Sequence, residues 1–472
     1  MTKYIKFTDF SFLLIILLSL FFYFNLYILN VDSLWTIYVS EQMLQGKTLY
    51  KDLIEVNPPL KFIYTLIPVY IANIFSISKV FCFVLFISIL IVISTLISYK
   101  VIKYTDFEER KKRYILLSII LILTIISITE YGEKEHLFMI FVFPYILLSI
   151  FREQIYFKKN MILIAVVFAS FGLNLKPHFF LIVLIIEIFL IIKKRKLLYF
   201  FRWDFILLIS ISLFYLIIVY IQFSEYLNFI IPFALKNYSY FNNQHLIVLI
   251  YNFEILIFIL FLYFAFMFNK QILKTQEIKL LMFLALGLLL IYLLQQKGWY
   301  YQRLPYFSIV VFLIFYTLIK FYDKKLFYFV FVLILIFIKI YEFQKYQYTP
   351  KNLISILQNY PKDTKVHIYS SDIAKGQPIV TANNQVWASR FNALYFILSM
   401  QRANNKESEE YVVKSIYEDL NKYHPDLLIF ENYYFDFFSY FSKFKRIENF
   451  YIKNYYIHKI KNYIILERKH ID

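Results

Sequence analysis

The chain has 472 residues, of which 60% are apolar and 22% aromatic, and its formal net charge is +18. Long apolar runs such as Phe10 to Leu29 exceed what a soluble core needs, and a helix that crosses a bilayer requires about 20 apolar residues. The Lys and Arg residues cluster beside these runs, so membrane topology explains the charge better than a nucleic-acid partner, which we do not expect. The one cysteine, Cys82, excludes a disulfide framework or a cysteine metal site.

Apolar runs separated by basic clusters predict about eleven membrane-spanning helices, because the runs lack the alternation of barrel strands. The first run has no small-residue cleavage site, so it is expected to remain as a signal anchor. The motif Lys176-Pro177-His178 predicts a kink between the fifth and sixth spans. The predicted spans cover approximately residues 10–30, 77–99, 114–129, 137–151, 161–175, 178–192, 204–222, 246–268, 279–294, 305–321 and 326–345.

The segment from Pro58 to Ser76 is apolar but is predicted to lie in, or re-enter, the outer membrane interface. It opens with Pro58-Pro59, carries Lys61 and contains Pro68. With the N-terminus inside, this choice puts most Lys and Arg residues on the inner side, including the cluster at 100–113. Counting the segment as a span would move that cluster outside.

An odd number of spans places the C-terminal tail on the outer face, which gives a transmembrane domain at 1–345 and a soluble domain at 346–472. The tail predicts strands at 365–369, 426–430 and 463–468 and an amphipathic helix at 406–423. The expected fold is therefore an all-α polytopic membrane protein with a C-terminal extracytoplasmic α/β domain.

Unusual polar residues gather in the predicted outer loops, whereas the inner loops hold mostly Lys and Arg. Ionisable groups near membrane depth are costly and usually mark a site, so these clusters indicate one shared pocket. The clusters are Val31–Trp35, Gly46–Asp52, Glu55–Pro59, Glu130–His136, Lys176–His178 and Gln295–Pro305.

Asp32 follows the first predicted span by about two residues. A carboxylate at that depth could take a proton from an acceptor hydroxyl as the hydroxyl attacks a sugar carbon. The alternative is a helix cap, with Asp32 or Ser33 preceding the amphipathic stretch 34–44. The sequence favours neither interpretation over the other.

The loop at 130–136 offers three further carboxylates, Glu130, Glu133 and Glu135. They are candidate oxygen ligands for a divalent cation or candidate helpers of the acceptor, and His136 would add a nitrogen ligand. The alternative is a solvated loop that merely joins two short spans.

Lys176, His178, Lys297 and Arg303 are predicted as cations at the outer ends of helices, where they could hold a lipid phosphate and stabilise it as a leaving group. Snorkelling toward lipid headgroups is the alternative. Trp299 and Tyr301 could stack on a sugar, or belong to an interfacial aromatic belt. In the tail, Arg390 within 387–391 could lean over the pocket, or serve ordinary domain packing.

Together these motifs resemble the GT-C membrane glycosyltransferases, closest to the family 39 group of protein O-mannosyltransferases and the aminoarabinose transferase. The likeness runs from residue 32 to about 391, and the order and shared sidedness of the motifs carry it. The motifs are Asp32 after the first span, Gly46–Asp52 with Tyr50 and Asp52, Asn57–Leu60, Tyr131–His136, Leu175–Phe179, Lys297–Pro305 and Trp387–Phe391.

The resemblance implies an inverting transfer from a polyprenyl-phosphate sugar to a hydroxyl of a glycan, lipid or protein at the bacterial plasma membrane. Asp32 matches the catalytic acid–base position, and a second acidic position falls within 130–135. The chain departs from the family where Ser33 replaces a usual glutamate and Gln302 a usual histidine. No nucleotide sugar is implied, and the sequence has no glycine-rich phosphate loop.

Two alternatives use the same features. A transporter or flippase of lipid-linked sugars would share the basic groups but would tolerate loss of the Asp32 carboxylate. An oligosaccharide polymerase or ligase would perform a related transfer from an oligosaccharide donor. A non-enzymatic scaffold would not require polar residues gathered on one side.

Overall fold

A computed structural model describes residues 29–152, 154–238, 253–295, 297–322, 350–432, 435–460 and 462–469. The predicted spans at 10–30 and 326–345 therefore lie almost wholly outside the described residues. The chain divides into two compact units. The described residues of the first come from 29–33, 58–222 and 253–322, and those of the second from 34–57, 223–238 and 350–469.

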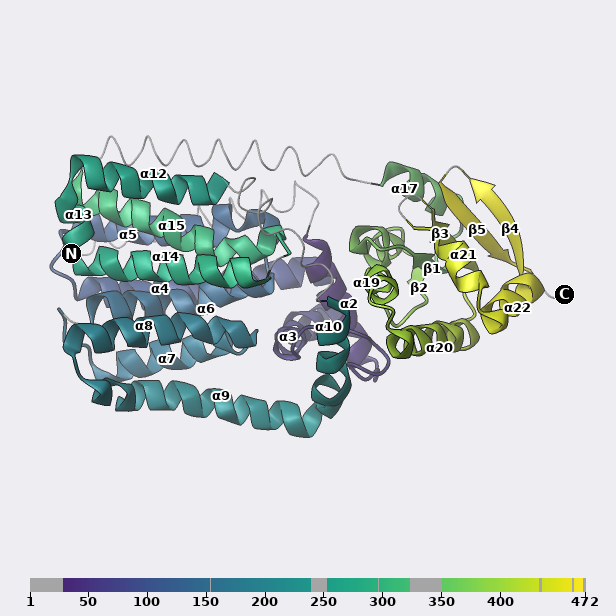
Figure 1. Cartoon of the computed structure of the whole chain (residues 1–472), viewed down its shortest axis with the longest axis horizontal. Coiled ribbons are helices and arrows are strands. Elements are labelled where there is room, and N and C mark those ends of the chain that lie inside the picture. The colour runs from purple at the N-terminus through teal and green to yellow at the C-terminus, as the bar shows by residue number, and fades with distance from the viewer. Residues whose placement is uncertain are drawn as a thin grey trace. The chain divides into compact units, whose positions relative to one another are not determined.

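The first unit is a bundle in which all the long helices except α3 (Leu60–Phe75) run alongside one another (Figure 1). Ten of the described helices begin and end near predicted apolar segments, as the pattern of apolar runs and basic clusters requires. The helices are α3 (Leu60–Phe75), α4 (Lys79–Lys103), α5 (Glu109–Leu121), α6 (Lys134–Phe151), α7 (Lys159–Leu173), α8 (Phe180–Lys194), α9 (Trp203–Gln222), α12 (Phe253–Phe268), α14 (Gln276–Gln295) and α15 (Tyr300–Phe321), with the short α13 (Lys270–Lys274) between α12 and α14.

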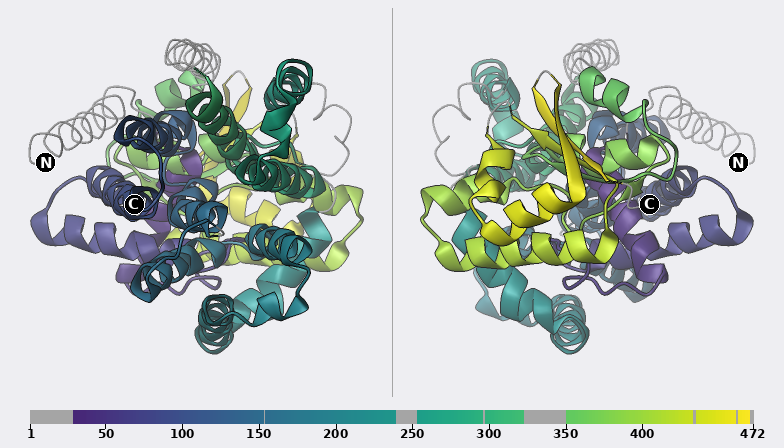
Figure 2. Two further views of the ribbon diagram at one scale, coloured as in Figure 1. Left: turned by 90° about the vertical axis from the view of Figure 1, so that its left-hand side faces the viewer. Right: turned by 90° about the vertical axis from the view of Figure 1, so that its right-hand side faces the viewer.

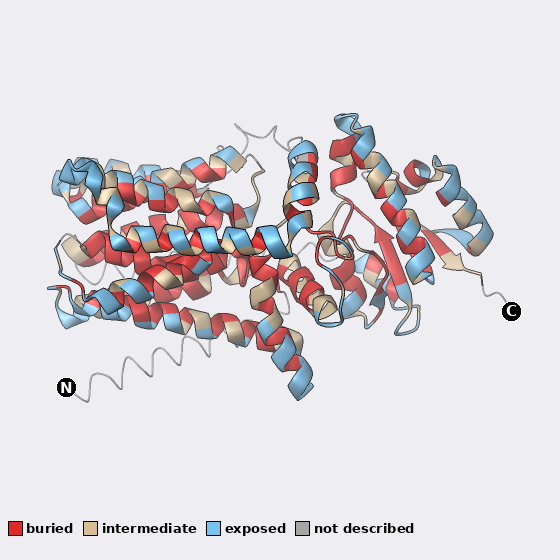
Figure 3. Ribbon diagram, turned by 90° about the horizontal axis from the view of Figure 1, so that it is seen from below, coloured by how far each residue is buried: buried red, intermediate tan, exposed pale blue. Residues whose placement is uncertain are grey.

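Five described helices are long and apolar enough to cross a membrane, namely α4, α6, α9, α14 and α15. Large apolar side chains on the outer sides of the bundle are exposed, such as Leu96 at 51%, Phe214 at 64% and Leu290 at 56%. Figure 3 shows buried residues in the middle of the bundle and exposed ones on its outward faces. An apolar exterior over a packed interior is what a bilayer solvates, so the chain is a helical membrane-embedded protein. The count of eleven spans stays a prediction.

Helix α6 is the centre of the bundle, because all of its residues from Lys134 to Phe151 are buried. Helices α4, α7, α14 and α15 all pack against it. The approach of α7 is close because Gly172 has no side chain: a Cβ there would lie 2.7 Å from the Cβ of Phe141. The Glu-Lys-Glu-His motif therefore stands at the N-terminal end of the most enclosed helix.

The segment predicted to lie at the interface forms helix α3, with Pro68 inside it. Lys61, in its first turn, is 1% exposed. The helix ends at Ser76, whose φ of 52° is left-handed and stops the helical hydrogen bonding. The position of α3 relative to the bilayer stays a prediction.

The second unit contains a five-stranded sheet of order β2-β1-β3-β5-β4, whose strands are drawn in the right-hand view of Figure 2. Strand β1 pairs in parallel with β2 and β3, while β5 runs antiparallel to β3 and β4. Ile429 of β3 lies opposite Ile368 and Ile465, which builds an apolar centre. The strands are β1 (Lys365–Tyr369), β2 (Val386–Trp387), β3 (Leu427–Glu431), β4 (Tyr455–Ile460) and β5 (Tyr463–Arg468).

Several helices of the second unit pack against this sheet or against one another. The predicted helix at 406–423 is confirmed as α20, and the three predicted strands are confirmed as β1, β3 and β5. Strand β2 was missed because it has only two residues, and β4 because its side chains are mostly exposed and lack an apolar face. The helices are α10 (Ile231–Tyr238), α17 (Lys351–Leu357), α18 (Gln377–Ala382), α19 (Phe396–Arg402), α20 (Lys406–Tyr423), α21 (Phe437–Ser442) and α22 (Lys445–Asn454).

Two segments distant in sequence complete the second unit, a grouping that the sequence did not predict. The N–H of Ile54 donates to the carbonyl of Arg390 at 2.8 Å. The side-chain amide of Asn237 donates to Ser408 Oγ at 2.9 Å. Residues 34–57 and 223–238 thus belong structurally with the tail.

Candidate functional site

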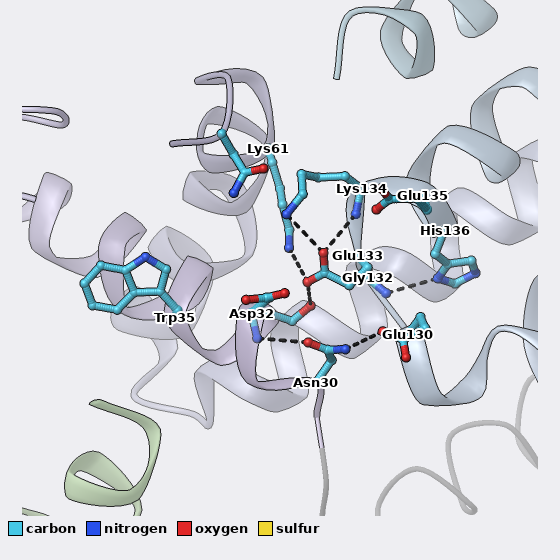
Figure 4. A network of polar contacts seen from close by, with 12 residues as sticks. Asn30, Asp32, Trp35, Lys61, Glu130, Gly132, Glu133, Lys134, Glu135 and His136 are labelled. Atoms are coloured by element: carbon cyan, nitrogen blue, oxygen red, sulfur yellow. Dashed lines mark hydrogen bonds and ion pairs between the residues drawn. The ribbon is translucent and has the colours of Figure 1, made fainter. Parts of the chain in front are cut away.

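Asp32 lies in the first turn of helix α2 (Val31–Leu44), not at a cap position. The cap interpretation was therefore wrong: the N–H of Asp32 donates to Oδ1 of Asn30 at 2.9 Å, so the asparagine satisfies the helix end. The Asp32 carboxylate is half-buried and points toward Lys61 and Glu133 (Figure 4). The Asn30 side chain thus caps this helix end.

Glu133 is the hub of a buried network in the first unit (Figure 4). Its Oε1 accepts from Lys61 Nζ at 2.7 Å and from Ser33 Oγ at 3.2 Å. Its Oε2 lies 3.2 Å from Lys134 Nζ. Residues from α2, α3 and the start of α6 therefore meet at one carboxylate.

Two physical effects keep Glu133 ionised although it is buried. Burial alone would raise the pKa of its carboxyl, but the ammonium groups of Lys134 and Lys61 hold that pKa well below its usual range. Glu133 also caps α6, where the helix dipole favours negative charge. The surroundings therefore favour the charged form of Glu133, and its catalytic role stays a prediction.

The loop that presents Glu133 is held by His136 and Gly132. Nδ1 of His136 accepts from the N–H of Gly132 at 3.0 Å, and its Nε2 lies 2.8 Å from the carbonyl of Leu123. Both ring nitrogens therefore have backbone partners, so His136 positions the loop. Gly132 has a φ of +79°, and a Cβ there would lie 2.4 Å from the Phe83 ring. Only glycine fits this turn without strain.

The three glutamates of the loop separate into different contacts. Glu130 is buried and accepts a hydrogen bond from the amide of Asn30, whereas Glu135 pairs with Lys176. Within the described part of the chain, no three His, Cys, Asp or Glu side chains are grouped so that they could hold a metal ion. A divalent cation thus stays a prediction.

A second ion pair joins the loop before α8 to the start of α6. Lys176 Nζ lies 2.5 Å from Oε1 of Glu135, while Oε2 of Glu135 is buried without a hydrogen-bond partner. The centroid of the Tyr301 ring lies 5.1 Å from Lys176 Nζ and 5.8 Å from Lys134 Nζ. Cation–π contact of this kind orders both ammonium groups.

His178 and Lys297 lie close enough to Lys176 for its charge to change their pKa values. Burial, then Lys176 and Lys297, lower the pKa of His178 to about 3, a direction that favours the neutral imidazole, and its role toward a lipid phosphate stays a prediction. Its buried Nε2 has no hydrogen-bond partner. Burial and Lys176 lower the pKa of Lys297 to about 8, so its ammonium remains mostly charged at neutral pH.

Trp299 and Arg303 flank this group in different ways. Lys297 Nζ lies 5.0 Å from the Trp299 ring centroid. Arg303 is buried, pairs with Glu254 at 3.0 Å and lies 4.3 Å from the Tyr300 ring. The charge of Arg303 is therefore balanced by its own carboxylate, and its donor-binding role stays a prediction.

The remaining predicted residues, Tyr50, Asp52 and Arg390, belong to the second unit and make contacts within it. The hydroxyl of Tyr50 donates to the carbonyl of Asn57 at 2.7 Å. Asp52 accepts from Lys422 at 3.0 Å, and Arg390 donates to Asp419 at 2.8 Å. These bonds organise the second unit, and a binding role for the three residues stays a prediction.

Sequence reasoning assigned no site role to four members of the network, Asn30, Ser33, Lys61 and Lys134, although Ser33 and Lys134 lie within the predicted polar clusters. The sequence around Lys61 did indicate a buried ion pair, because a lone lysine within an apolar helix must find a partner when it is buried. Nothing in the sequence indicated that Ser33 and Asn30 belong to a site, since Ser and Asn are common beside helix starts. Comparison of the chain with protein-family models, with curated proteins and with solved structures finds no match.

Proposed function

We propose that this chain is a membrane glycosyltransferase that moves a sugar from a polyprenyl-phosphate carrier to an acceptor hydroxyl. The observation that carries the proposal is the half-buried Asp32 carboxylate pointing into a buried network of lysines paired to Glu133 and Glu135. Such a site joins a proton acceptor to a cationic cradle for phosphate.

The degree of burial supports Asp32 as the base. Glu130, Glu133 and Glu135 are each at most 3% exposed and have cationic or amide partners. Asp32 is the carboxylate of the network with access for an incoming hydroxyl. In the proposed step it takes the acceptor proton while the acceptor oxygen forms a bond to the anomeric carbon.

The lysines support stabilisation of the leaving group. As the new bond forms on one face of the sugar, the bond from the anomeric carbon to the phosphate oxygen breaks on the other. Both electrons of that bond leave with the polyprenyl phosphate, and the configuration inverts. Lys176 and Lys297 would hold the growing negative charge, because a partly desolvated ammonium interacts strongly with phosphate.

The proposal includes a location. Eleven spans, with α3 at the interface, would put Asp32, the loop at 130–136 and Lys297 on the outer face of a bacterial plasma membrane and the tail domain outside. The donor would enter laterally from the lipid. Membrane lipids and a glycan, lipid or protein acceptor are the proposed partners.

The test is Asp32→Asn in the full chain, with Asp106→Asn as the control. Asp106 is exposed and remote from the network, so its replacement by Asn makes the same chemical change without touching the site. Membranes holding equal amounts of each variant are given radiolabelled polyprenyl-phosphate hexoses, and release of polyprenyl phosphate is measured. We expect Asp32→Asn to reduce release by at least about a hundredfold, with Asp106→Asn unchanged. Full release by Asp32→Asn would remove the proposed base.

The same variants separate the alternatives. A flippase needs the cations but no base, so Asp32→Asn would still move a fluorescent polyprenyl-phosphate sugar across proteoliposomes. A polymerase or ligase would be inactive with single-sugar donors and active with oligosaccharide donors.

A further inference from the structure

The second unit contains a cavity of about 470 Å³ beside the sheet, built largely by one face of α22. Residues spaced by three and four positions share a helix face, and the lining residues of α22 follow that spacing. The opposite face buries Ile447 and Tyr451. The lining residues of α22 are Arg446, Asn449, Phe450, Lys453 and Asn454.

The C-terminal end of α20 forms the second wall. Tyr417, Asn421 and His424 line the cavity from this side. Aromatic rings make its apolar surface: Phe450 lies 6.3 Å from Tyr417 and 6.0 Å from Tyr455 between ring centroids. The side-chain amides of Asn421 and Asn454 each donate to a carbonyl of their own helix, which fixes where their oxygens lie.

The charge of the cavity is entirely positive. Arg446, Lys453 and Arg468 line it, and none of its lining residues, all within the described ranges, is Asp or Glu. The presence of Arg468 is explained by stabilisation of the C-terminal end of α20, because Arg468 donates to the carbonyl of His424 at 3.2 Å. It does not account for Arg446, because that residue stands in the first turn of α22, where the helix dipole disfavours a cation.

We propose that this cavity binds an anionic carbohydrate, meaning a sugar chain that carries phosphate or carboxylate groups. Cations supply the charge recognition, aromatic faces the apolar contact with sugar rings, and asparagine side chains the hydrogen bonds to hydroxyls. A volume of about 470 Å³ falls in the range of small-ligand sites. The inference goes beyond the proposed transfer, since it concerns binding by the second unit alone.

The test measures binding to the purified full chain in detergent. The probes are phosphorylated mannopentaose, neutral mannopentaose, a hyaluronan tetrasaccharide that carries carboxylates, and inorganic phosphate. The variant is Arg446→Gln with Lys453→Gln, two exposed side chains whose replacement leaves the core intact. Arg402→Gln, an exposed arginine of α19 outside the cavity, is the matched control.

We expect at least one anionic oligosaccharide to bind more tightly than both neutral mannopentaose and inorganic phosphate, with an affinity that falls as salt rises. The double variant should weaken that binding about tenfold or more, and Arg402→Gln should not change it. Equal binding of the neutral sugar, equal binding of inorganic phosphate, or an unchanged double variant would each overturn the proposal. Because transfer is not the readout, failure here is distinguishable from failure of the proposed enzyme.

Discussion

At the residue scale, the network depends on charge balance at Glu133. Lys61 and Lys134 are almost fully buried, and a buried ammonium without a carboxylate is strongly destabilising. The network is therefore a structural requirement as well as a candidate site. Its two roles can be separated by comparing the removal of one charge with the removal of an opposite pair.

Glu133→Gln is expected to lower the free energy of unfolding by about 3–5 kcal/mol, because it leaves two lysines with a neutral amide. Adding Lys61→Met should restore part of that loss. Thermal unfolding in detergent measures both. Glu109→Gln is the control, since Glu109 is 72% exposed and its pair with Lys112 contributes at most about 1 kcal/mol. Equal losses for Glu133→Gln and Glu109→Gln would contradict the buried network.

If the proposed site binds a lipid phosphate through Lys297, that binding should depend on pH. The ammonium form should bind, and its pKa of about 8 means that the affinity is nearly full at pH 7, declines through pH 8 and is largely lost by pH 9. The ligand for this measurement is farnesyl phosphate. Its phosphate group is fully ionised above about pH 7, since its second pKa is about 6. We therefore expect binding about tenfold weaker at pH 9 than at pH 7, measured by titration calorimetry.

Lys297→Arg is the matched variant for this measurement, because a guanidinium stays charged throughout the range. Most of the decline between pH 7 and pH 9 should disappear in it. An identical decline in the variant would assign the pH dependence to another group.

At the element scale, the turn before α6 is set by Gly132. Gly132→Ala is expected to cost about 1–3 kcal/mol from the left-handed φ alone, and collision with Phe83 adds to this. Phe83→Leu should relieve the collision, so the double variant should melt at a higher temperature than Gly132→Ala. If the losses in the free energy of unfolding from the two single substitutions simply added in the double variant, the two positions would not be in contact.

Sequence periodicity predicted the elements better than the site. Apolar runs bounded by Lys and Arg located α4, α6, α9 and α14, and strand β5 followed from its pattern. Lys61 was used only as an argument against a span, because its partner Glu133 lies 72 residues away and no local rule joins them. The π-helical turn at Ile122–Ile126 also left no local signal. Contacts between distant segments decide the network, and a single sequence does not encode them visibly.

At the scale of the whole molecule, the proposed topology can be tested by sided labelling. In a Cys82→Ser background, single cysteines replace Asp106, between α4 and α5, and Pro177, before α8. Both positions are exposed. With α3 at the interface, an impermeant maleimide should label position 177 in intact cells and position 106 only after permeabilisation. Labelling of position 106 in intact cells would instead make α3 a span.

The grouping of 34–57 and 223–238 with the tail has a consequence at the same scale. Residues 346–472 do not form the second unit alone, because Asp52 pairs with Lys422 and Asn237 with Ser408. Studies of that unit therefore require the full chain.

The central claim is that lysines of the network hold a lipid phosphate beside Asp32. A cryo-electron microscopy structure of the full chain with bound polyprenyl phosphate tests it most directly. We predict the phosphate within hydrogen-bond distance of Lys176 or Lys297, with the Asp32 carboxylate facing the space where the sugar would lie. A phosphate bound out of reach of both lysines, with Asp32 turned away from it, would contradict the claim.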